Sequence, residues 1–305
     1  MNRTRGAAER HIADSESRIA RHSATVEAPP LMPAMCAEGV APLASWETPA
    51  MRIAQLAWGE GCSKPGDASY VSSLAGTLDL DSTKTVMEFG AGLGADARAL
   101  HRRCGARIVG YETDGAFAAA ARRLSASAGL EKAVEIVRYS PREFAPSRDS
   151  YDCILSRETL FQIERKDEAL IKMELALKPR GQVVLTDFVL NPGIAADDAR
   201  LRSLIPGPVF FWTASRYGHH FRERNFDLRA SEDVTAAYRK LVIDGCKRYA
   251  EGGRDFVANA KAYPDAMAAF LKLCQARVTA FDSGLLQVRR FAAVKLSGPR
   301  LMSDW

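Results

Sequence analysis

The middle of the chain alternates between short apolar runs and longer stretches in which apolar residues recur at helical spacing. The short runs predict five strands, at residues 85–89, 107–112, 134–139, 151–156 and 182–190. Helical spacing predicts helices before and between them, at residues 70–80, 114–127 and 166–177. Strands and helices that alternate in this way favour a parallel sheet with helices on both faces.

The segments that flank this core follow other patterns. Residues 1–44 are rich in Ala, Arg, Glu, Ser and Pro, which predicts a disordered or loosely packed segment. Helical spacing returns at residues 46–58. After residue 192 the alternation stops, and residues 194–222 form an apolar stretch with many aromatic side chains.

The C-terminal third predicts a sixth strand, a helical stretch and a last strand. These are expected at residues 225–229, 231–281 and 285–295. We expect the last strand to pair beside the strand at 182–190, with the helical stretch as a cap on the site. The predicted fold is therefore of the α/β class, with a doubly wound, mostly parallel seven-stranded sheet and a helical cap. We divide the chain into an N-terminal segment (1–44), N-terminal helices with a loop (45–83), a cofactor-binding core (84–192) and a cap region with the last strands (193–300).

Composition excludes several classes of function. The chain of 305 residues has a formal net charge of +5, but its basic residues are spread out, so we expect no nucleic-acid partner. Six cysteines lie far apart without a CxxC pair, and only five histidines accompany them, so we expect no metal site. Because we find neither a secretory segment nor an apolar run of about 18 residues, we expect a cytoplasmic protein with reduced thiols and no membrane insertion.

A glycine turn follows the strand at 85–89, in the pattern Glu88-x-Gly-x-Gly-x-Gly94. Gly90, Gly92 and Gly94 have no Cβ atom, so a ligand can approach the backbone closely, at the N-terminus of a helix with free amide donors. The Glu88 carboxylate would repel a pyrophosphate and suits a ligand with cationic or hydroxylated groups. The same turn also matches the dinucleotide fingerprint when it is counted to Ala95. A nicotinamide or flavin domain, and a purely structural turn, therefore stay open.

An acidic residue, Glu112, ends the second strand and can accept hydrogen bonds from both ribose hydroxyls of a nucleoside. It can alternatively cap the helix that follows, through its neighbours Thr113 and Asp114. Together with the glycine turn, Glu112 resembles the first two motifs of class I methyltransferases that depend on S-adenosylmethionine (SAM). This resemblance implies a Rossmann-like methyltransferase fold. It also aligns Ser140, after the third strand, with an Asp that holds the adenine amino group in many members.

Four ordered motifs sharpen the resemblance. They are Gly59-Glu-Gly-Cys-Ser-Lys-Pro-Gly66, the glycine turn, Leu155-Ser-Arg-Glu-Thr-Leu-Phe-Gln-Ile163 and Val184-Leu-Thr-Asp-Phe188. Together they resemble the phosphoethanolamine N-methyltransferase group, and more broadly methyltransferases of the type 11 kind, over roughly residues 55–190. The first motif follows Trp58 and is either a lid over the cofactor or a surface turn beside a packing anchor.

Two features of that group are missing. Gln162 stands where its catalytic His is expected, and the first tyrosine of the chain is Tyr70, so its Tyr/His dyad is absent. Its phosphate-holding Tyr and Arg residues are not recognisable in residues 194–222. There Phe210, Phe211 and Trp212 suggest an apolar acceptor or a cation held by aromatic faces. The resemblance therefore does not carry over the substrate.

These observations predict a SAM-dependent methyltransferase that acts on a small-molecule acceptor, an amine or a lipid-related metabolite. The acceptor would attack the SAM methyl group in line, in a site that excludes water. The predicted cofactor-binding residues are Glu88, Gly90, Gly92, Gly94, Glu112, Thr113, Ser140 and Ser156. Alternatives are an NAD(P)-dependent oxidoreductase and a SAM-binding protein without catalysis.

The predicted catalytic residues are Gln162 and Glu158, because both follow the fourth strand and face the expected cofactor crevice. Asp187 at the end of the fifth strand is a further candidate for substrate contact. His219 and His220 are either a replacement base or a solvated surface pair. The acceptor, the number of methyl groups transferred and the oligomeric state stay open.

Overall fold

A computed structural model describes residues 40–205, 207–250 and 254–297. The prediction of disorder for residues 1–44 falls almost wholly on residues 1–39, which lie outside the described residues. The fold reported below is that of the described residues.

Within the described residues, eight strands form one sheet, with the order β3-β2-β1-β4-β5-β8-β7 and with β6 paired to β5. The strands are β1 Thr85–Phe89, β2 Arg107–Glu112, β3 Val134–Arg138, β4 Tyr151–Arg157, β5 Leu177–Leu190, β6 Trp212–Thr213, β7 Phe226–Asp233 and β8 Leu286–Lys295. Strands β1 to β5 run parallel, and β8 is antiparallel to both β5 and β7. The doubly wound, mostly parallel sheet is confirmed, as is the place of the last strand beside the fifth.

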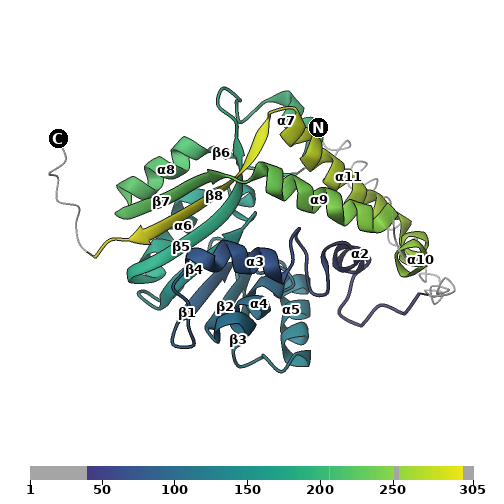
Figure 1. Cartoon of the computed structure of the whole chain (residues 1–305), viewed down its shortest axis with the longest axis horizontal. Helices are drawn as coiled ribbons and strands as arrows, with labels where there is room; N and C mark the ends of the chain where they lie inside the picture. Colours follow the sequence, from purple (N-terminus) through teal and green to yellow (C-terminus); the bar gives the residue numbers. More distant parts are fainter. Residues whose placement is uncertain (1–39, 206, 251–253, 298–305) are drawn as a thin grey trace, which may run out of the picture. The chain divides into compact units, whose positions relative to one another are not determined.

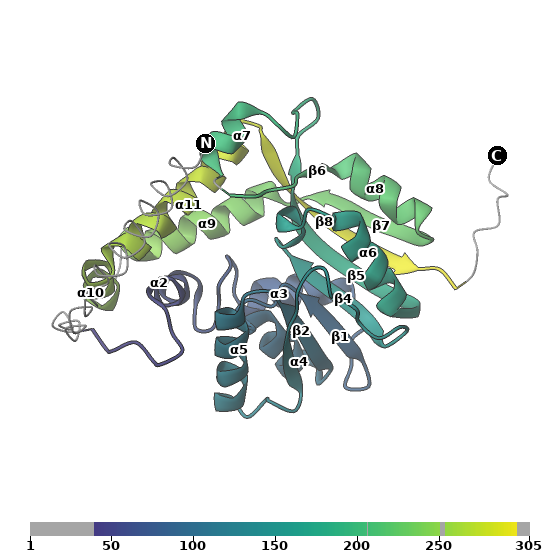
Figure 2. The same ribbon diagram turned by 180° about the vertical axis from the view of Figure 1, so that it is seen from behind.

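Helices cover both faces of the sheet and extend beyond it (Figure 1). They are α2 Pro49–Trp58, α3 Ala68–Leu74, α4 Ala95–Cys104, α5 Gly115–Ser127, α6 Lys166–Ala176, α7 Ala199–Leu204, α8 Ala214–Glu223, α9 Thr235–Ala250, α10 Arg254–Ala262 and α11 Pro264–Asp282, with short 3₁₀ turns at Ala75–Thr77 (η1) and Leu160–Gln162 (η2). Helices α3, α4 and α5 lie on one face, and α6 and α8 lie on the other, which is seen in Figure 2.

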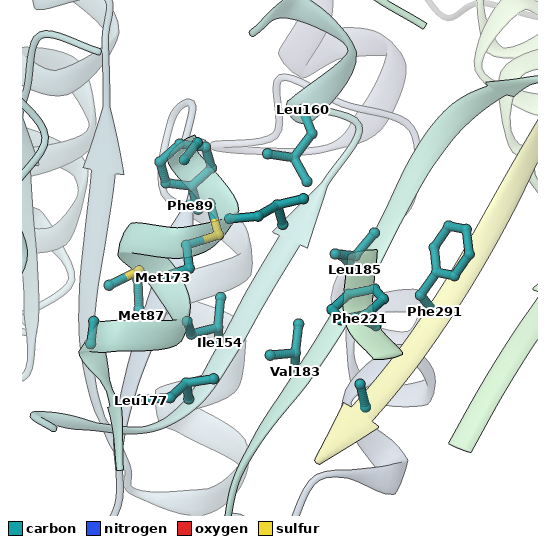
Figure 3. Packing of buried hydrophobic residues seen from close by; sticks show 14 of the residues in the cluster. Met87, Phe89, Ile154, Leu160, Met173, Leu177, Val183, Leu185, Phe221 and Phe291 are labelled. Atoms are coloured by element: carbon teal, nitrogen blue, oxygen red, sulfur yellow. The ribbon is translucent and has the colours of Figure 1, made fainter. Parts of the chain in front are cut away.

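Alternating side chains of the strands supply the buried core on each face. On the α6 and α8 face, Met87, Ile154 and Val183 from neighbouring strands pack against Met173 and Phe221 of the helices (Figure 3). Successive residues of a strand point to opposite faces, and both sets are buried and apolar here, so the sheet has an apolar core on each face. This burial fixes which strand ends lie side by side at the carboxyl edge of the sheet.

The predicted helical cap is present ahead of the last strand. Helix α11 packs on both α9 and α10, and α2 packs against all three. A separate apolar cluster joins them to the carboxyl end of β5 through Phe188 and Leu190. The sequence pattern did not predict that α2, which is about 180 residues away from α9, belongs to the cap.

Several boundaries differ from the predictions for reasons of pairing. Residues 231–233 were predicted as helix, but they extend β7 because Ser231 pairs with Phe291 and Asp233 with Arg289. The helix predicted at 70–80 gives way to η1 after Leu74. Strand β6 is an eighth strand that the sequence did not predict.

None of the helices in the described part of the chain has the length and apolar character needed to span a bilayer.

Candidate functional site

The glycine turn lies at the carboxyl end of β1 and needs glycine at three places. Gly90, Gly92 and Gly94 all have positive φ, at 85°, 55° and 77°. A Cβ atom on Gly90 would lie 2.0 Å from Thr159 Oγ1, and one on Gly92 would lie 2.3 Å from Ser63 Oγ. Both the backbone conformation and the close contacts exclude side chains here. The turn therefore has the geometry that the sequence predicted.

Glu112 is bound to this turn. Its Oε2 atom accepts a hydrogen bond from the Gly92 amide at 2.7 Å, and its Oε1 atom accepts one from the Asp114 amide at 2.9 Å. Helix α5 is capped by Asp114, whose carboxylate accepts from the Ala116 and Phe117 amides. Glu112 is therefore not the cap of α5, and its half-buried carboxylate stands at the edge of the glycine turn.

Two further carboxylates lie close to the turn. Glu88 is 2% exposed, and its Oε2 atom has no hydrogen-bond partner among the described residues. Burial raises the pKa of Glu88 well above its ordinary value, and the nearby Asp96 carboxylate adds to the rise. Asp96, in the first turn of α4, is itself buried. The turn thus has acidic neighbours in Glu88, Asp96 and Glu112, which attract cations, and Lys64, Arg157 and Arg98 already act on Glu88 as such cations.

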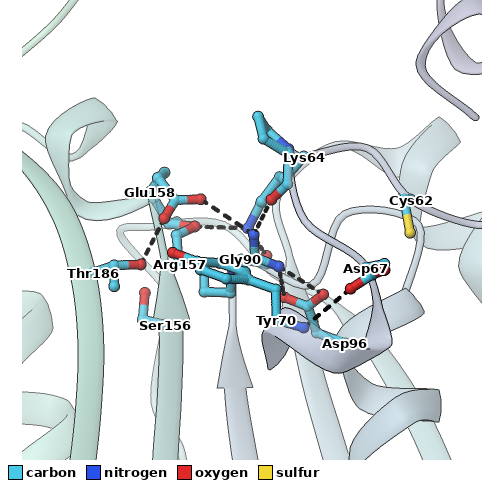
Figure 4. A network of polar contacts seen from close by, with 12 residues as sticks. Cys62, Lys64, Asp67, Tyr70, Gly90, Asp96, Ser156, Arg157, Glu158 and Thr186 are labelled. Atoms are coloured by element: carbon cyan, nitrogen blue, oxygen red, sulfur yellow. Dashed lines mark hydrogen bonds and ion pairs between the residues drawn. The ribbon is translucent and has the colours of Figure 1, made fainter. Parts of the chain in front are cut away.

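A buried ion pair joins the glycine turn to β4 (Figure 4). The Arg157 Nη1 atom donates to both Asp96 carboxylate oxygens, at 2.9 and 2.8 Å, and its Nη2 atom donates to the Pro65 carbonyl. The guanidinium also lies 4.9 Å from the centre of the Tyr70 ring. Burial lowers the pKa of Arg157, but the Asp96 and Glu158 carboxylates outweigh it and the net change is upward. Arg157 therefore connects the turn, β4 and the loop before α3.

The loop of residues 59–66, here called the lid loop, lies on the glycine turn. The Lys64 ammonium donates to the Gly90 and Arg157 carbonyls and to Thr159 Oγ1, at 2.6, 2.8 and 3.3 Å. Trp58, just before the loop, is 5% exposed, and the centre of its ring lies 5.4 Å from the centre of the Phe270 ring in the cap. Trp58 is thus a packing anchor, as one of the two alternatives predicted, and the loop lies on the turn, whereas its role as a lid over a cofactor stays a prediction.

Two cavities open beside the turn at the carboxyl edge of the sheet. One, of about 740 Å³, is lined by Thr113 and Ser140 together with Tyr111 and Tyr139. The other, of about 560 Å³, is lined by Gln162 with Phe89, Tyr139 and Phe210 among others. The structure therefore brings Thr113, Ser140 and Gln162 to one region, where Tyr139 borders both cavities.

Glu158 is held in an unusual conformation at the end of β4. Its φ is +41°, a left-handed conformation that non-glycine residues rarely adopt, and its amide donates to the Thr186 carbonyl at 2.8 Å. The Thr186 hydroxyl donates to Glu158 Oε1 at 2.6 Å, whereas the buried Oε2 has no hydrogen-bond partner among the described residues and lies 3.8 Å from Arg157 Nη2. Backbone strain and an unsatisfied oxygen are typical of functional positions. Glu158 is not among the residues that line the cavity with Gln162.

Two tyrosine hydroxyls that the sequence did not single out are buried in the same interior. Tyr70 of α3 and Tyr238 of α9 have hydroxyl groups without a partner in the described part of the chain. Burial raises the pKa of both, and the charge of the Glu158 carboxylate adds to both rises. The sequence contained no signal for Tyr238, because α9 lies outside the motifs and far from Glu158 in the sequence.

Other predicted residues have structural partners instead. Ser156 is 1% exposed and donates to the Phe89 carbonyl at 3.0 Å, joining β4 to β1. Asp187 is fully buried and accepts from the Tyr217 hydroxyl at 2.6 Å and the Phe161 amide at 3.1 Å, with the Lys166 ammonium 3.5 Å away. With both oxygens engaged, Asp187 fixes η2 and does not face the cavities beside the turn.

The histidine pair and the aromatic stretch match their predicted places only in part. His219 is exposed and lies 2.9 Å from Glu223 on α8, which supports the reading as a surface residue. Burial lowers the pKa of His220, whose ring lies 5.9 Å from that of Trp212. Phe211 and Trp212 are buried in the core. Of the three aromatic residues, only Phe210 lines the cavity of about 560 Å³ that also contains Gln162.

Comparison with known families gives a match over more than half of the chain. A model of a family described as a methyltransferase domain matches residues 68–231. This range contains the glycine turn, Glu112, the two cavities and most of the sheet. The family and the fold predicted from the sequence are thereby confirmed.

Curated relatives are distant. Phosphoethanolamine N-methyltransferase 3 of Arabidopsis thaliana is 24% identical over 187 residues, which are 61% of this chain and 37% of the relative. The 27-O-demethylrifamycin SV methyltransferase of Amycolatopsis mediterranei is 25% identical over 186 residues, which are 60% of this chain and 68% of the relative. The chain therefore spans little more than a third of the plant relative's length.

Solved structures share the fold. Phosphoethanolamine N-methyltransferase 2 of Haemonchus contortus, in complex with phosphomonomethylethanolamine and S-adenosylhomocysteine, is 17% identical with a TM-score of 0.72. That match covers 83% of this chain and 58% of the other. A [4+2]-cyclase is also 17% identical, with a TM-score of 0.65 over 82% of this chain and 93% of its own. At this level of identity the matches show the fold alone.

Proposed function

Because the chain belongs to the methyltransferase domain family, we propose that it transfers a methyl group from SAM to a small-molecule acceptor, an amine or a lipid-related metabolite. The observation that carries this proposal is the Gly92 amide bound to the Glu112 carboxylate, on a turn that Glu88 and Asp96 also surround. Acidic surroundings favour a ligand with positive charge, and SAM carries a sulfonium and an ammonium group.

The residues at the carboxyl edge fit such a cofactor. The turn at Gly90, Gly92 and Gly94 has no Cβ atoms, and the side chains of Thr159 and Ser63 lie against its backbone, where a ligand would take their place. Glu88 has a buried oxygen without a hydrogen-bond partner in the described residues. Thr113 and Ser140 border the same cavity, where an adenosine would find hydroxyl groups and the Tyr139 ring. We propose that these residues hold SAM, with Glu112 at the ribose and Ser156 supporting the turn through Phe89.

When bound, SAM supplies an electrophilic methyl group on its sulfonium. The chain's own contribution is to orient the acceptor and to exclude water, since in-line attack needs alignment more than acid–base help. Gln162 borders the cavity of about 560 Å³ and would position the acceptor. Glu158, with one oxygen held by Thr186 and the other 3.8 Å from Arg157 Nη2 and without a hydrogen-bond partner among the described residues, is our candidate for accepting a proton from a protonated acceptor.

The acceptor class is left broad for a physical reason. The named relatives act on phosphoethanolamine and on 27-O-demethylrifamycin SV, which differ greatly in size and charge. Gln162 replaces the histidine expected from the phosphoethanolamine group, so this chain differs from that group next to the acceptor. We therefore propose the reaction and leave the acceptor to a screen.

Calorimetric titration with SAM, S-adenosylhomocysteine and NADH tests the cofactor. We expect micromolar binding of the first two ligands and loss of that binding in Glu112→Ala, because the variant loses both the ribose acceptor and the bond to Gly92. Glu135→Ala is a matched control, since Glu135 is exposed on β3 and pairs only with Arg107 at the surface. Binding of NADH alone would overturn the proposal in favour of an oxidoreductase.

A SAM-binding protein without methyl transfer is the second candidate. The structural likeness to a [4+2]-cyclase favours it, because that protein is named for another reaction on the same fold. Formation of S-adenosylhomocysteine with a panel of amines, alcohols and carbon acceptors distinguishes the two candidates. Retained SAM binding without turnover over the whole panel would support the second.

A further inference from the structure

The Lys64 ammonium is held at the place where the ends of β1 and β4 meet. It donates to the Gly90 carbonyl at 2.6 Å, the Arg157 carbonyl at 2.8 Å and Thr159 Oγ1 at 3.3 Å (Figure 4). Three oxygen acceptors match the three N–H donors of a primary ammonium group. Two of them are main-chain carbonyls, so the site exists whatever side chain fills it.

The surroundings favour positive charge at this point. The Glu88 carboxylate lies two residues before Gly90, and among the cations that lower the pKa of Glu88 the Lys64 ammonium has the largest effect. Lys64 itself is half-buried, so its ammonium is partly removed from water. Charge-assisted hydrogen bonds in such a setting are stronger than those between neutral groups. The structure therefore contains a site for a primary ammonium group beside the glycine turn.

The neighbouring lid residue also occupies the turn. A Cβ atom on Gly92 would meet the Ser63 hydroxyl at 2.3 Å, so Ser63 lies directly against the backbone that glycine leaves uncovered. The lid loop is fixed there by the bond from Arg157 to the Pro65 carbonyl and by the Gly61 amide, which donates to Gln55 Oε1 at 2.8 Å. Two consecutive side chains of the lid thus fill the inner surface of the glycine turn.

We infer that Lys64 is an internal competitor of the cofactor, with its ammonium in the site that the amino group of SAM's methionine part takes. This inference rests on the proposed cofactor. SAM binding then requires Lys64 to leave the Gly90 and Arg157 carbonyls. The position of Lys64 in the lid loop therefore depends on whether the cofactor is bound. The lysine keeps the carbonyls and the acidic turn satisfied until the cofactor arrives.

Lys64→Met removes the competitor and keeps the length of the side chain. If the lysine is seated in about nine molecules of ten, the variant binds SAM about tenfold more tightly, because apparent affinity falls with the fraction of competent molecules. Lys64→Gln should behave in the same way. Lys132→Met is the matched control, since Lys132 is exposed between α5 and β3 and should leave the affinity unchanged.

Calorimetry with three ligands separates the possible roles of Lys64. Decarboxylated SAM keeps the amino group and lacks the carboxylate, whereas 5′-methylthioadenosine lacks both. We expect Lys64→Met to raise the affinities for SAM and for decarboxylated SAM by similar factors and to leave the affinity for 5′-methylthioadenosine unchanged. Circular dichroism melts of each variant confirm that the protein remains folded.

Each other outcome overturns the inference in a recognisable way. Weaker binding of SAM alone would mean that Lys64 holds the cofactor carboxylate. Equal tightening of all three ligands would mean that the lid excludes the nucleoside and not the amino group. Unchanged affinities would mean that Lys64 does not compete. If neither the wild type nor the variants bind SAM, the proposed function fails together with this inference. If the wild type binds SAM and Lys64→Met binds it no more tightly, only the inference fails.

Discussion

Replacing Asp96 by asparagine tests how strongly the buried ion pair holds the glycine turn against β4. The two side chains are 11% and 2% exposed, and Arg157 Nη1 lies 2.9 and 2.8 Å from the two Asp96 oxygens. Asparagine keeps the shape of the side chain and removes its charge. The guanidinium then remains buried, with the Glu158 carboxylate at 3.8 Å as its remaining ion-pair partner in the described part of the chain.

The magnitude follows from this burial. Removing one partner of a buried ion pair costs about 3–5 kcal/mol, mostly because the other charge stays buried without compensation. Since Glu158 still lies beside Arg157, we expect Asp96→Asn to lose about 3 kcal/mol of the free energy of unfolding, the lower end of that range. Urea unfolding followed by circular dichroism at neutral pH measures this loss.

An exposed ion pair provides the control. Arg107 and Glu135 lie 2.7 Å apart, but their side chains are 57% and 50% exposed. Glu135→Gln should therefore cost about 1 kcal/mol or less. If Asp96→Asn costs no more than this control, the ion pair does not hold the turn, and the reasoning from burial is refuted.

Two further predictions concern buried titratable groups. Burial raises the pKa of Glu88 above its ordinary value of 4.5, so the cost of ionising this carboxyl is absent below that pH and grows as pH rises toward the folded pKa. Relative to wild type, Glu88→Gln should therefore become more stable as pH rises from 5 to 8, as urea unfolding at each pH would show. Tyr217→Phe removes the hydroxyl that donates to Asp187 at 2.6 Å and should cost about 1–3 kcal/mol, measured in the same way.

Each of these has a contradicting result. If the difference between Glu88→Gln and wild type is the same at every pH, Glu88 does not titrate with a raised pKa. If Tyr217→Phe is as stable as wild type, the Lys166 ammonium at 3.5 Å and the Phe161 amide satisfy Asp187 without the hydroxyl. His219→Ala is a suitable control for the second variant, because His219 is exposed on the same helix.

The fold was largely predictable because its signals are local. Apolar runs and helical spacing within windows of 5 to 15 residues placed five parallel strands and the last strand close to their observed bounds. Where the prediction was wrong, a distant partner decided the conformation. Residues 231–233 read as helix in isolation, and pairing with β8 makes them strand.

The candidate site was predictable in part for the same reason. The glycine turn and Glu112 were predicted because a backbone with positive φ and a strand-end acid leave a mark in the sequence, and both lie where they were expected. Asp187 was misplaced because a strand-end acid looks the same whether it faces a cavity or a buried lysine. The lysine that distinguishes the two, Lys166, is visible as a partner only in the structure.

The sequence by itself determined the α/β alternation, the glycine turn and the acidic residue beside it, since each depends on neighbours a few positions away. Only the tertiary structure decided that Lys64 lies on the Gly90 carbonyl and that Tyr238 reaches the neighbourhood of Glu158. These pairs are 26 and 80 positions apart in the sequence. They exist because burial of the two faces of the sheet and of the cap brings those segments together, and a local pattern carries no record of that packing.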